Sequence, residues 1–203
     1  SDKIDLRLRL SIGGGLNWME FHSAIEKQST IFKAPEIDAE DPAILYYTSG
    51  SAGKPKGVLH AARAIFTWRV SAWYWLTLMD NDVMWCTADT GWAKAGTSIL
   101  FGPWSTGSTV LVYDGPFDPS QRFKLLTKYR VTVFCAGATE LRQLIQQDTR
   151  KHDLSQLRLT VSAGESVNPE IVNKWRAITG GLLLDGYGQT ETLMTILNYR
   201  LCH

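Results

Sequence analysis

The sequence has 203 residues, of which 44% are hydrophobic and 20% are charged, and this is the composition of a globular domain with one large core. The same composition excludes disordered and fibrous chains. Because 21 lysines and arginines face 20 aspartates and glutamates, the net charge at pH 7 is only +1. Without a basic field we expect no binding to nucleic acid.

The cysteines and the apolar stretches bear on the cellular compartment. The three cysteines, at positions 86, 135 and 202, lack the spacing of a zinc site and leave one thiol over in any disulfide scheme, which favours a reducing compartment. The longest uncharged run, residues 95–113, is interrupted by glycine and proline, so we expect no membrane span. The N-terminal SDKIDLRLRL lacks the apolar core of a secretory signal. We therefore expect a cytoplasmic or mitochondrial matrix protein that is not secreted, while its oligomeric state stays open.

The first forty residues predict a strand, a short helix and a linker. Apolar and polar residues alternate over residues 6–12, which is typical of a strand with one buried face. Asn17 is predicted to cap a short helix, with Glu20 at the capping-box position. Residues 29–42 contain two prolines and scattered acids, and they predict a surface linker.

From residue 43 onward, short apolar runs alternate with helical patterns. The apolar runs predict buried strands at residues 43–47, 83–87, 109–113, 131–135, 158–162 and 182–185. Helices are predicted at residues 60–79, after Asp118-Pro119, at residues 139–147, and between Asn168-Pro169 and Gly180-Gly181. The alternation predicts an α/β fold with a mostly parallel sheet covered by helices. In such sheets ligands bind beyond the carboxyl ends of the strands.

The segment TSGSAGKPKG, residues 48–57, is named here the phosphate segment. It contains three glycines, three hydroxyls and two lysines between a predicted strand and a predicted long helix. Glycines allow successive backbone N–H groups to face one anion, hydroxyls add donors, and lysines add positive charge. The segment therefore predicts a site for the phosphates of a nucleotide.

Other motifs that bind phosphate or carry a nucleophile do not fit this sequence. A P-loop would need Gly at the place of Thr48 and Ser or Thr at the place of Pro55. A dinucleotide fingerprint starting at Gly13 fails because its sixth position is Trp18. Ser51 and Lys54 spell S-x-x-K, but the partner motifs of a penicillin-binding enzyme are missing from the sequence.

The string YYTSGSAGKPKGVLH resembles the phosphate-binding signature of the adenylate-forming (AMP-binding) superfamily, which includes acyl-CoA synthetases, luciferases and peptide-synthetase adenylation domains. The string DGYGQTET, residues 185–192, resembles the second signature of that superfamily and is named here the second signature. WCTADTGWAKAG, VFCAGATELRQLIQ and VSAGESVNPEIVNKWR are most similar to the medium-chain acyl-CoA synthetases. The resemblance covers residues 43–199.

The resemblance implies an enzyme that couples a small carboxylic acid to ATP, releases pyrophosphate, and passes the acyl group from the acyl-adenylate to coenzyme A. It implies that the phosphate segment holds the β- and γ-phosphates through Thr48, Ser49, Gly50, Ser51, Ala52, Gly53, Lys54, Pro55 and Lys56. Lys54 or Lys56 would supply the more direct charge, and Thr190 would bond the α-phosphate. Lys56, Thr190 and Glu191 are the expected catalytic residues. Glu191 would hold Mg²⁺ as a hard oxygen ligand.

The resemblance also assigns the adenine and the acid. Tyr187 would lie along the adenine, and the residues around it in this role are Gly164, Glu165, Asp185, Gly186, Gly188 and Gln189. Ser166 stands where the superfamily has a proline after Gly-Glu. Most tryptophans are expected in the core, but Trp92 and Gly91 lie where the superfamily places the acid pocket. The dispersed His22, His60 and His152 are interpreted as structural or surface groups.

The similarity ends near Tyr199, and the ribose-binding Asp, the hinge Arg and the small C-terminal domain of the superfamily cannot be located in the sequence. We therefore expect residues 1–203 to be a partial AMP-binding domain, part of the large N-terminal domain of an adenylate-forming enzyme, inactive alone. The leading reading of the parent is an ATP-dependent ligase joining a medium-chain or related acid to coenzyme A. The alternatives are an amino-acid-activating adenylation domain and a non-catalytic nucleotide-binding fragment.

Overall fold

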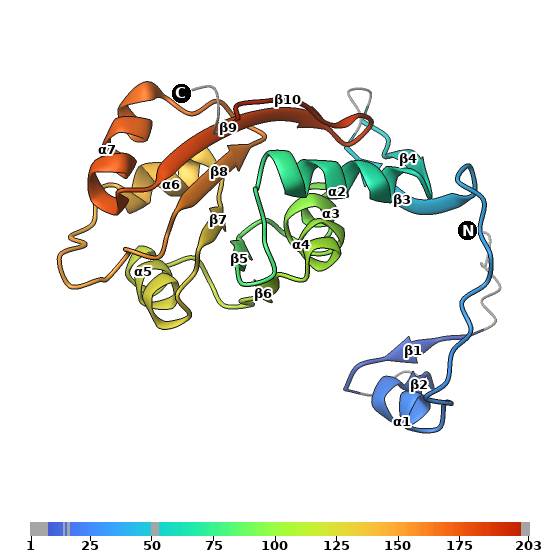
Figure 1. Cartoon of the computed structure of the whole chain (residues 1–203). Coiled ribbons are helices and arrows are strands. Elements are labelled where there is room, and N and C mark those ends of the chain that lie inside the picture. Colours follow the sequence, from blue (N-terminus) through green and yellow to red (C-terminus); the bar gives the residue numbers. More distant parts are fainter. Residues whose placement is uncertain (1–7, 14, 16, 50–52, 200–203) are drawn as a thin grey trace. The chain divides into compact units, whose positions relative to one another are not determined.

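The computed structural model describes residues 8–13, 15, 17–49 and 53–199, and the chain divides into two compact units, Ser1–Ile37 and Asp38–His203 (Figure 1). The first unit contains β1 (Leu10–Ser11), β2 (Met19–Glu20) and α1 (Phe21–Glu26), and its two strands pair in parallel. The strand predicted at residues 6–12 is confirmed only as β1, and residues 6 and 7 lie outside the described part.

The predicted cap of α1 is wrong. The helix begins at Phe21, and its N-cap is Glu20, whose carboxylate accepts the Ser23 backbone N–H at 2.8 Å. Asn17 has a left-handed φ of 56° and lies before β2. Pairing of β2 with β1 delays the start of the helix, so the glutamate takes the capping role itself. The predicted linker is confirmed, because residues 27–41 contain no helix or strand.

The second unit contains a sheet of six strands in the order β10-β9-β8-β7-β5-β6. Its strands are β5 (Val83–Cys86), β6 (Thr109–Leu111), β7 (Val133–Cys135), β8 (Leu159–Ala163), β9 (Leu182–Gln189) and β10 (Leu193–Leu197). All neighbours pair in parallel except β10, which is antiparallel to β9. The predicted mostly parallel sheet is therefore confirmed, with an antiparallel edge strand that the sequence analysis missed.

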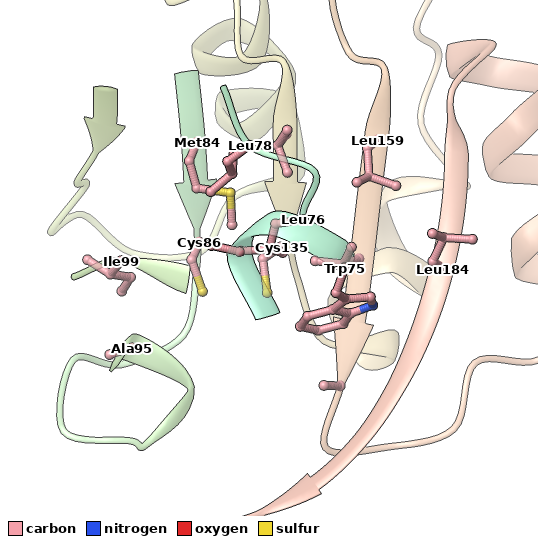
Figure 2. Packing of buried hydrophobic residues seen from close by; sticks show 14 residues of the cluster. Trp75, Leu76, Leu78, Met84, Cys86, Ala95, Ile99, Cys135, Leu159 and Leu184 are labelled. Carbon is pink, nitrogen blue, oxygen red and sulfur yellow. The ribbon is translucent and has the colours of Figure 1, made fainter. Parts of the chain in front are cut away.

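Helices cover both faces of this sheet. They are α2 (Ala64–Tyr74), α3 (Lys94–Ser98), α4 (Phe101–Thr106), α5 (Pro119–Lys128), α6 (Ala138–Leu144) and α7 (Pro169–Thr179). Successive strand residues point to opposite faces, so Met84 and Cys86 pack with Trp75 and Leu76 in one core cluster (Figure 2). Trp85, between them in sequence, belongs to the second cluster, with residues of α5, α6 and α7.

The capping signals of two helices are confirmed. Asp118 accepts the Gln121 backbone N–H at 2.6 Å at the start of α5. Asn168 accepts the Glu170 backbone N–H at 2.8 Å at the start of α7, and Gly180 ends that helix with a left-handed φ of 71°.

The helix predicted at residues 60–79 begins too early. β4 (Lys56–Ala61) occupies its first residues and pairs in antiparallel register with β3 (Pro42–Thr48), and α2 begins only at Ala64. The two strands form a sheet of their own. The phosphate segment therefore begins at the last residue of β3 and ends within β4, so it leads from a strand into a second strand and not into a helix. Cross-strand pairing overrides the helix-favouring residues around His60.

More of the second signature is β-strand than predicted. We expected a strand ending at Asp185, but β9 continues to Gln189 because β10 returns beside it as an antiparallel partner. Residues 190–192 form the turn between the two strands. Within the described residues, none of the helices is long and apolar enough to cross a membrane.

Candidate active site

A cavity of about 460 Å³ lies where the phosphate segment and the second signature meet, and it is named here the central cavity. Its lining residues are Tyr46, Tyr47, Thr48, Ser49, Trp68, Gly91, Trp92, Ala93, Lys94, Thr97, Ala163, Gly164, Gly188, Gln189, Thr190, Leu193 and Met194. They come from β3, α2, the loop after β5, α3, the end of β8 and the β9–β10 hairpin. The fold thus brings together three segments that the sequence analysis selected separately.

The phosphate segment contributes its N-terminal part to the cavity. Thr48, half-buried at the end of β3, pairs in register with Lys56, and Ser49 follows it. Lys54 and Lys56 are exposed and do not line the cavity. Gly50, Ser51 and Ala52 lie outside the described residues. Two hydroxyl-bearing residues of the predicted phosphate site therefore line the cavity in the described part of the segment.

The rest of the hairpin connection has a backbone that depends on glycine. Gly53 has a φ of +81°, a left-handed conformation that other residues adopt only at a cost. Pro55, which follows Lys54, is exposed and leads directly into β4.

The second signature runs along β9 and is packed closely from behind. A Cβ atom on Gly186 would lie 2.8 Å from the ring of Trp75, and one on Gly188 would lie 2.2 Å from the carbonyl oxygen of Leu193. Tyr187, between the two glycines, is 55% exposed. The glycines let β9 lie against Trp75 and β10, while the Tyr187 ring stays free on the open side.

A second cavity, of about 340 Å³, collects most of the residues assigned to adenine. It is named here the adenine cavity, and it is lined by Gly164, Glu165, Ser166, Asp185, Gly186, Tyr187, Gly188, Ile196 and Asn198. Most of these residues belong to two separate motifs of the sequence, and the neighbouring strands β8 and β9 bring the motifs side by side. Gln189 lines the central cavity instead.

Two acids of the adenine cavity are held by backbone groups. The Glu165 carboxylate accepts the Thr139 backbone N–H at 2.7 Å and its hydroxyl at 2.9 Å. The backbone N–H bond, more than the hydroxyl, holds the pKa of Glu165 below its usual range. Asp185 accepts the backbone N–H groups of Gly186 at 2.9 Å and Val167 at 3.3 Å. These bonds fix the turn after β8 even though Ser166 replaces the superfamily's proline.

The turn that connects β9 with β10 carries the remaining assigned residues. Thr190 is half-buried and lines the central cavity, whereas Glu191 is exposed. Leu193, directly after the turn, is buried and has a left-handed φ of 58°. Such a conformation is uncommon for leucine, and strained backbone of this kind is held in place by its surroundings.

The loop after β5 also lines the central cavity. Trp92 is 64% exposed and lines both the central cavity and a third cavity of about 590 Å³. Asp89, which accepts the Gly91 backbone N–H at 2.7 Å, fixes the approach to Trp92. Gly91 and Trp92 therefore line the central cavity, and their role in holding the acid stays a prediction.

Two residues near the cavity were missed in the sequence. Lys94 supplies the only charged side chain among the described lining residues of the central cavity, and its ammonium donates a hydrogen bond to the carbonyl of Ala163. His60, interpreted from the sequence as structural or surface, is buried and bonds the carbonyl of Thr190. Lys94 could have been noticed because it follows Trp92 by two residues, whereas nothing in the sequence links His60 to Thr190.

The described residues offer few protein ligands for a metal ion. In the described part of the chain, no three His, Cys, Asp or Glu side chains gather in a way that could hold one. Mg²⁺ at nucleotide sites usually takes one or two carboxylates together with phosphate oxygens and water. The exposed Glu191 carboxylate fits that arrangement when a polyphosphate lies in the central cavity.

Residues 6–202 match the model of a family described as AMP-binding enzyme. The chain belongs to this family. Mitochondrial acyl-coenzyme A synthetase ACSM3 of Mus musculus is 40% identical over 185 residues, which are 90% of this chain and 32% of that protein. Mitochondrial acyl-coenzyme A synthetase ACSM5 of Homo sapiens is 32% identical over 197 residues, which are 96% of this chain and 34% of that protein. The chain thus spans about a third of the length of these relatives.

Solved structures of the family share this architecture. The anthranilate CoA ligase AuaEII in complex with anthranoyl-AMP is 28% identical with a TM-score of 0.86, covering 94% of this chain and 38% of that one. The acyl-CoA synthetase of Brucella canis is 28% identical with a TM-score of 0.84, covering 94% of this chain and 35% of that one. The fold is thus the α/β fold of a part of the large domain of adenylate-forming enzymes.

Proposed function

We propose that this chain is part of an ATP-dependent ligase that joins a carboxylic acid to coenzyme A through an acyl-adenylate. The observation that carries the proposal is the central cavity, whose wall combines hydroxyls of both signatures with the Trp92 loop. The similarity to proteins named acyl-CoA synthetases, over 90% and more of this chain, supports the same activity.

In the proposed reaction a carboxylate oxygen attacks the α-phosphorus of ATP. The new C–O–P linkage gives the acyl-adenylate, and the bond to the departing pyrophosphate breaks. The thiol of coenzyme A then attacks the acyl carbon, the thioester forms, the thiol loses its proton, and AMP leaves. Because two anions must approach in the first step, the site has to position them and neutralise charge.

In this proposal the phosphates of ATP lie at the central cavity and its adenine lies in the adenine cavity. Thr48 and Ser49 would donate to the β- and γ-phosphates, and Thr190 to the α-phosphate. Tyr187 would lie against the adenine in the adenine cavity. Lys54 and Lys56, exposed on the hairpin, would add charge to the polyphosphate from outside the cavity. When bound, Mg²⁺ held by Glu191 and phosphate oxygens would neutralise phosphate charge.

The acid would occupy the aromatic part of the central cavity. Trp68, Trp92 and Met194 offer apolar surface, and Lys94 offers an ammonium group that meets no carboxylate in the described lining. An ammonium with unused donors favours an anionic ligand, which the carboxylate of an acid provides. The medium-chain preference rests on the resemblance and on the names of the relatives.

The same charge distribution disfavours the alternative hypothesis of an amino-acid-activating adenylation domain. A bound amino acid needs an anion near its ammonium group, but the nearby Asp89 lines the third cavity and is engaged by the Gly91 backbone. Lys94 in the central cavity would repel a substrate ammonium.

The exchange of labelled pyrophosphate into ATP tests the proposal. The full-length ligase of which this chain is proposed to be a part is incubated with ATP, Mg²⁺ and, in turn, fatty, aromatic and amino acids. Exchange stimulated by fatty or aromatic acids, followed by acyl-CoA formation on addition of coenzyme A, is expected of the enzyme. Exchange stimulated only by amino acids contradicts it, and calorimetric ATP binding without exchange identifies a non-catalytic nucleotide-binding protein. The names of the relatives favour the mitochondrial matrix as its compartment.

A further inference from the structure

His60 lies between the two segments that are proposed to hold the phosphates. It belongs to β4, is only 8% exposed, and its Nε2 lies 2.7 Å from the carbonyl oxygen of Thr190. The two residues are 130 positions apart in the sequence. β4 belongs to the two-stranded sheet and Thr190 to the turn of the six-stranded sheet, so the bond joins two sheets that share no strand pair.

The imidazole of His60 is held between aromatic rings. The ring of Tyr46 meets it edge-on at a centroid distance of 6.2 Å, and the ring of Trp68 lies at the same distance on a tilted plane. No carboxylate forms an ion pair with His60 in the part of the chain that the structure describes. Packing therefore sets the direction of the ring, and Nε2–H is the donor that meets the carbonyl.

The hydrogen bond engages the backbone of Thr190 and leaves its side chain available. The Thr190 hydroxyl has no hydrogen bond with any of the described residues, so it can donate to a ligand. Glu191 follows in the same turn, and the peptide held by His60 is the one that joins the two residues. Leu193, directly after the turn, has a left-handed φ that leucine rarely adopts, so packing against neighbouring residues must hold the backbone in this conformation.

We infer that His60 is a positioning residue that fixes the Thr190–Glu191 peptide against the β3–β4 hairpin, so that both signatures face one nucleotide. The inference rests on the proposed function, because it assigns His60 a purpose in binding ATP. It predicts that loss of the bond weakens ligands that carry an α-phosphate and spares ligands that lack one.

Three variants and three ligands test this inference by calorimetry. H60L removes the donor, H60Q keeps an N–H at a similar reach, and H152L is a matched control at a half-buried histidine that stacks on Phe123. For H60L we expect ATP and AMP to bind about ten-fold more weakly, since one hydrogen bond and the fixed turn are lost, and adenosine to change by less than about two-fold. H60Q should restore most of the loss, and H152L should match the wild type.

Other outcomes overturn the inference. Equal weakening of adenosine, AMP and ATP would mean that H60L damages the fold, and unchanged ATP binding would mean that the bond positions nothing. If the wild type binds no nucleotide, the proposed function fails, and the bond itself is still tested by long-range ¹H–¹⁵N spectra of the histidines. A proton on Nε2 of His60 is expected, and the tautomer with the proton on Nδ1 contradicts the inference whatever the ligand data show.

Discussion

Glu191 lies exposed in the turn between β9 and β10, where its carboxylate contacts solvent. We predict that Glu191→Gln in the full-length ligase lowers pyrophosphate exchange at limiting Mg²⁺ by about 10²–10³-fold, because an amide offers the ion no full charge. The melting temperature should not change, since an exposed side chain is replaced by one of the same shape. Exchange unaffected at limiting Mg²⁺ would remove Glu191 from the site.

Trp92 is exposed at the mouth of the central cavity, in contrast to the fully buried Trp85 of β5. We predict that Trp92→Ala shifts the preference among acids of different chain length in the exchange assay. Each methylene contact is worth about 1–3 kcal/mol, so the shift should be graded.

The stability of this variant separates binding from packing. Trp92→Ala should leave the melting temperature almost unchanged, whereas Trp85→Ala should cost about 3–5 kcal/mol because it empties a space in the core. A large loss of stability in Trp92→Ala with unchanged acid preference would assign Trp92 to packing.

At the scale of elements, Asp82 ties three strands together at one end of the sheet. It is 3% exposed and accepts hydrogen bonds from Thr132, Arg158 and the Met79 backbone N–H, at distances from 2.5 to 3.1 Å. Burial alone would raise its pKa, but the bonds from Arg158 and Thr132, with the one from Met79, outweigh burial and hold the pKa below its usual range.

This network predicts a pH dependence of stability. A carboxylate whose pKa is lowered in the folded state contributes its stabilisation above its unfolded pKa of about 3.9, and the contribution disappears as the pH falls through the folded value. The free energy of unfolding from urea titrations should therefore fall below about pH 4. Asp82→Asn should lose about 3 kcal/mol at pH 7 and show a flatter acid limb. An acid limb as steep as that of the wild type would contradict this account.

The β9–β10 hairpin leaves no space for a side chain at Gly188. In Gly188→Ala the new methyl would lie 2.2 Å from the Leu193 carbonyl, so the backbone of β10 must move. We predict a loss of about 1–3 kcal/mol together with loss of ATP binding, measured by thermal unfolding and calorimetry. Gly180→Ala is the control. Its left-handed φ of 71° costs a similar energy, but nothing lies within 4 Å of the new atom, so ATP binding should persist.

At the scale of the whole molecule, the sequence predicts those strands and helix caps that depend on residues close together in the chain. β7 (Val133–Cys135), predicted at residues 131–135, and the caps at Asp118 and Asn168 are readable because β-branched runs and capping residues act over a few positions. β4 was missed because its strand character comes from pairing with β3, and the extension of β9 because it comes from β10. Such pairing depends on tertiary context that propensity does not contain.

Some residues of the candidate site could likewise be predicted from the sequence, and others could be found only from the fold. The phosphate segment was selected by its glycines, hydroxyls and lysines, and the second signature by its resemblance to a superfamily. The structure places Thr48, Ser49 and Thr190 at one cavity. Lys94 and His60 needed the fold, because their partners Ala163 and Thr190 lie 69 and 130 positions away. Exposed tryptophans such as Trp73 and Trp104 likewise cannot be told from buried ones by composition.

The division of the proposed nucleotide site between two separate sheets has a consequence for its hydrogen exchange. The amides of β9 lie between β8 and β10, whereas β3 and β4, among the described strands, pair only with each other. Opening of a two-stranded sheet is cheap, so amides of β4 should exchange with deuterium well before those of residues 183–188. Mass-spectrometric exchange measures both segments in one experiment, and equal rates would show that the sheets open together.

Because the site is divided between two sheets, we expect loss of ATP binding and unfolding of the chain to occur at different temperatures. The β3–β4 hairpin should leave its position before the parallel sheet melts, so affinity for ATP should disappear several degrees below the loss of the circular dichroism signal. Saturating ATP should slow exchange in β4 more than in β9, because a polyphosphate bound to both signatures links the less stable sheet to the more stable one.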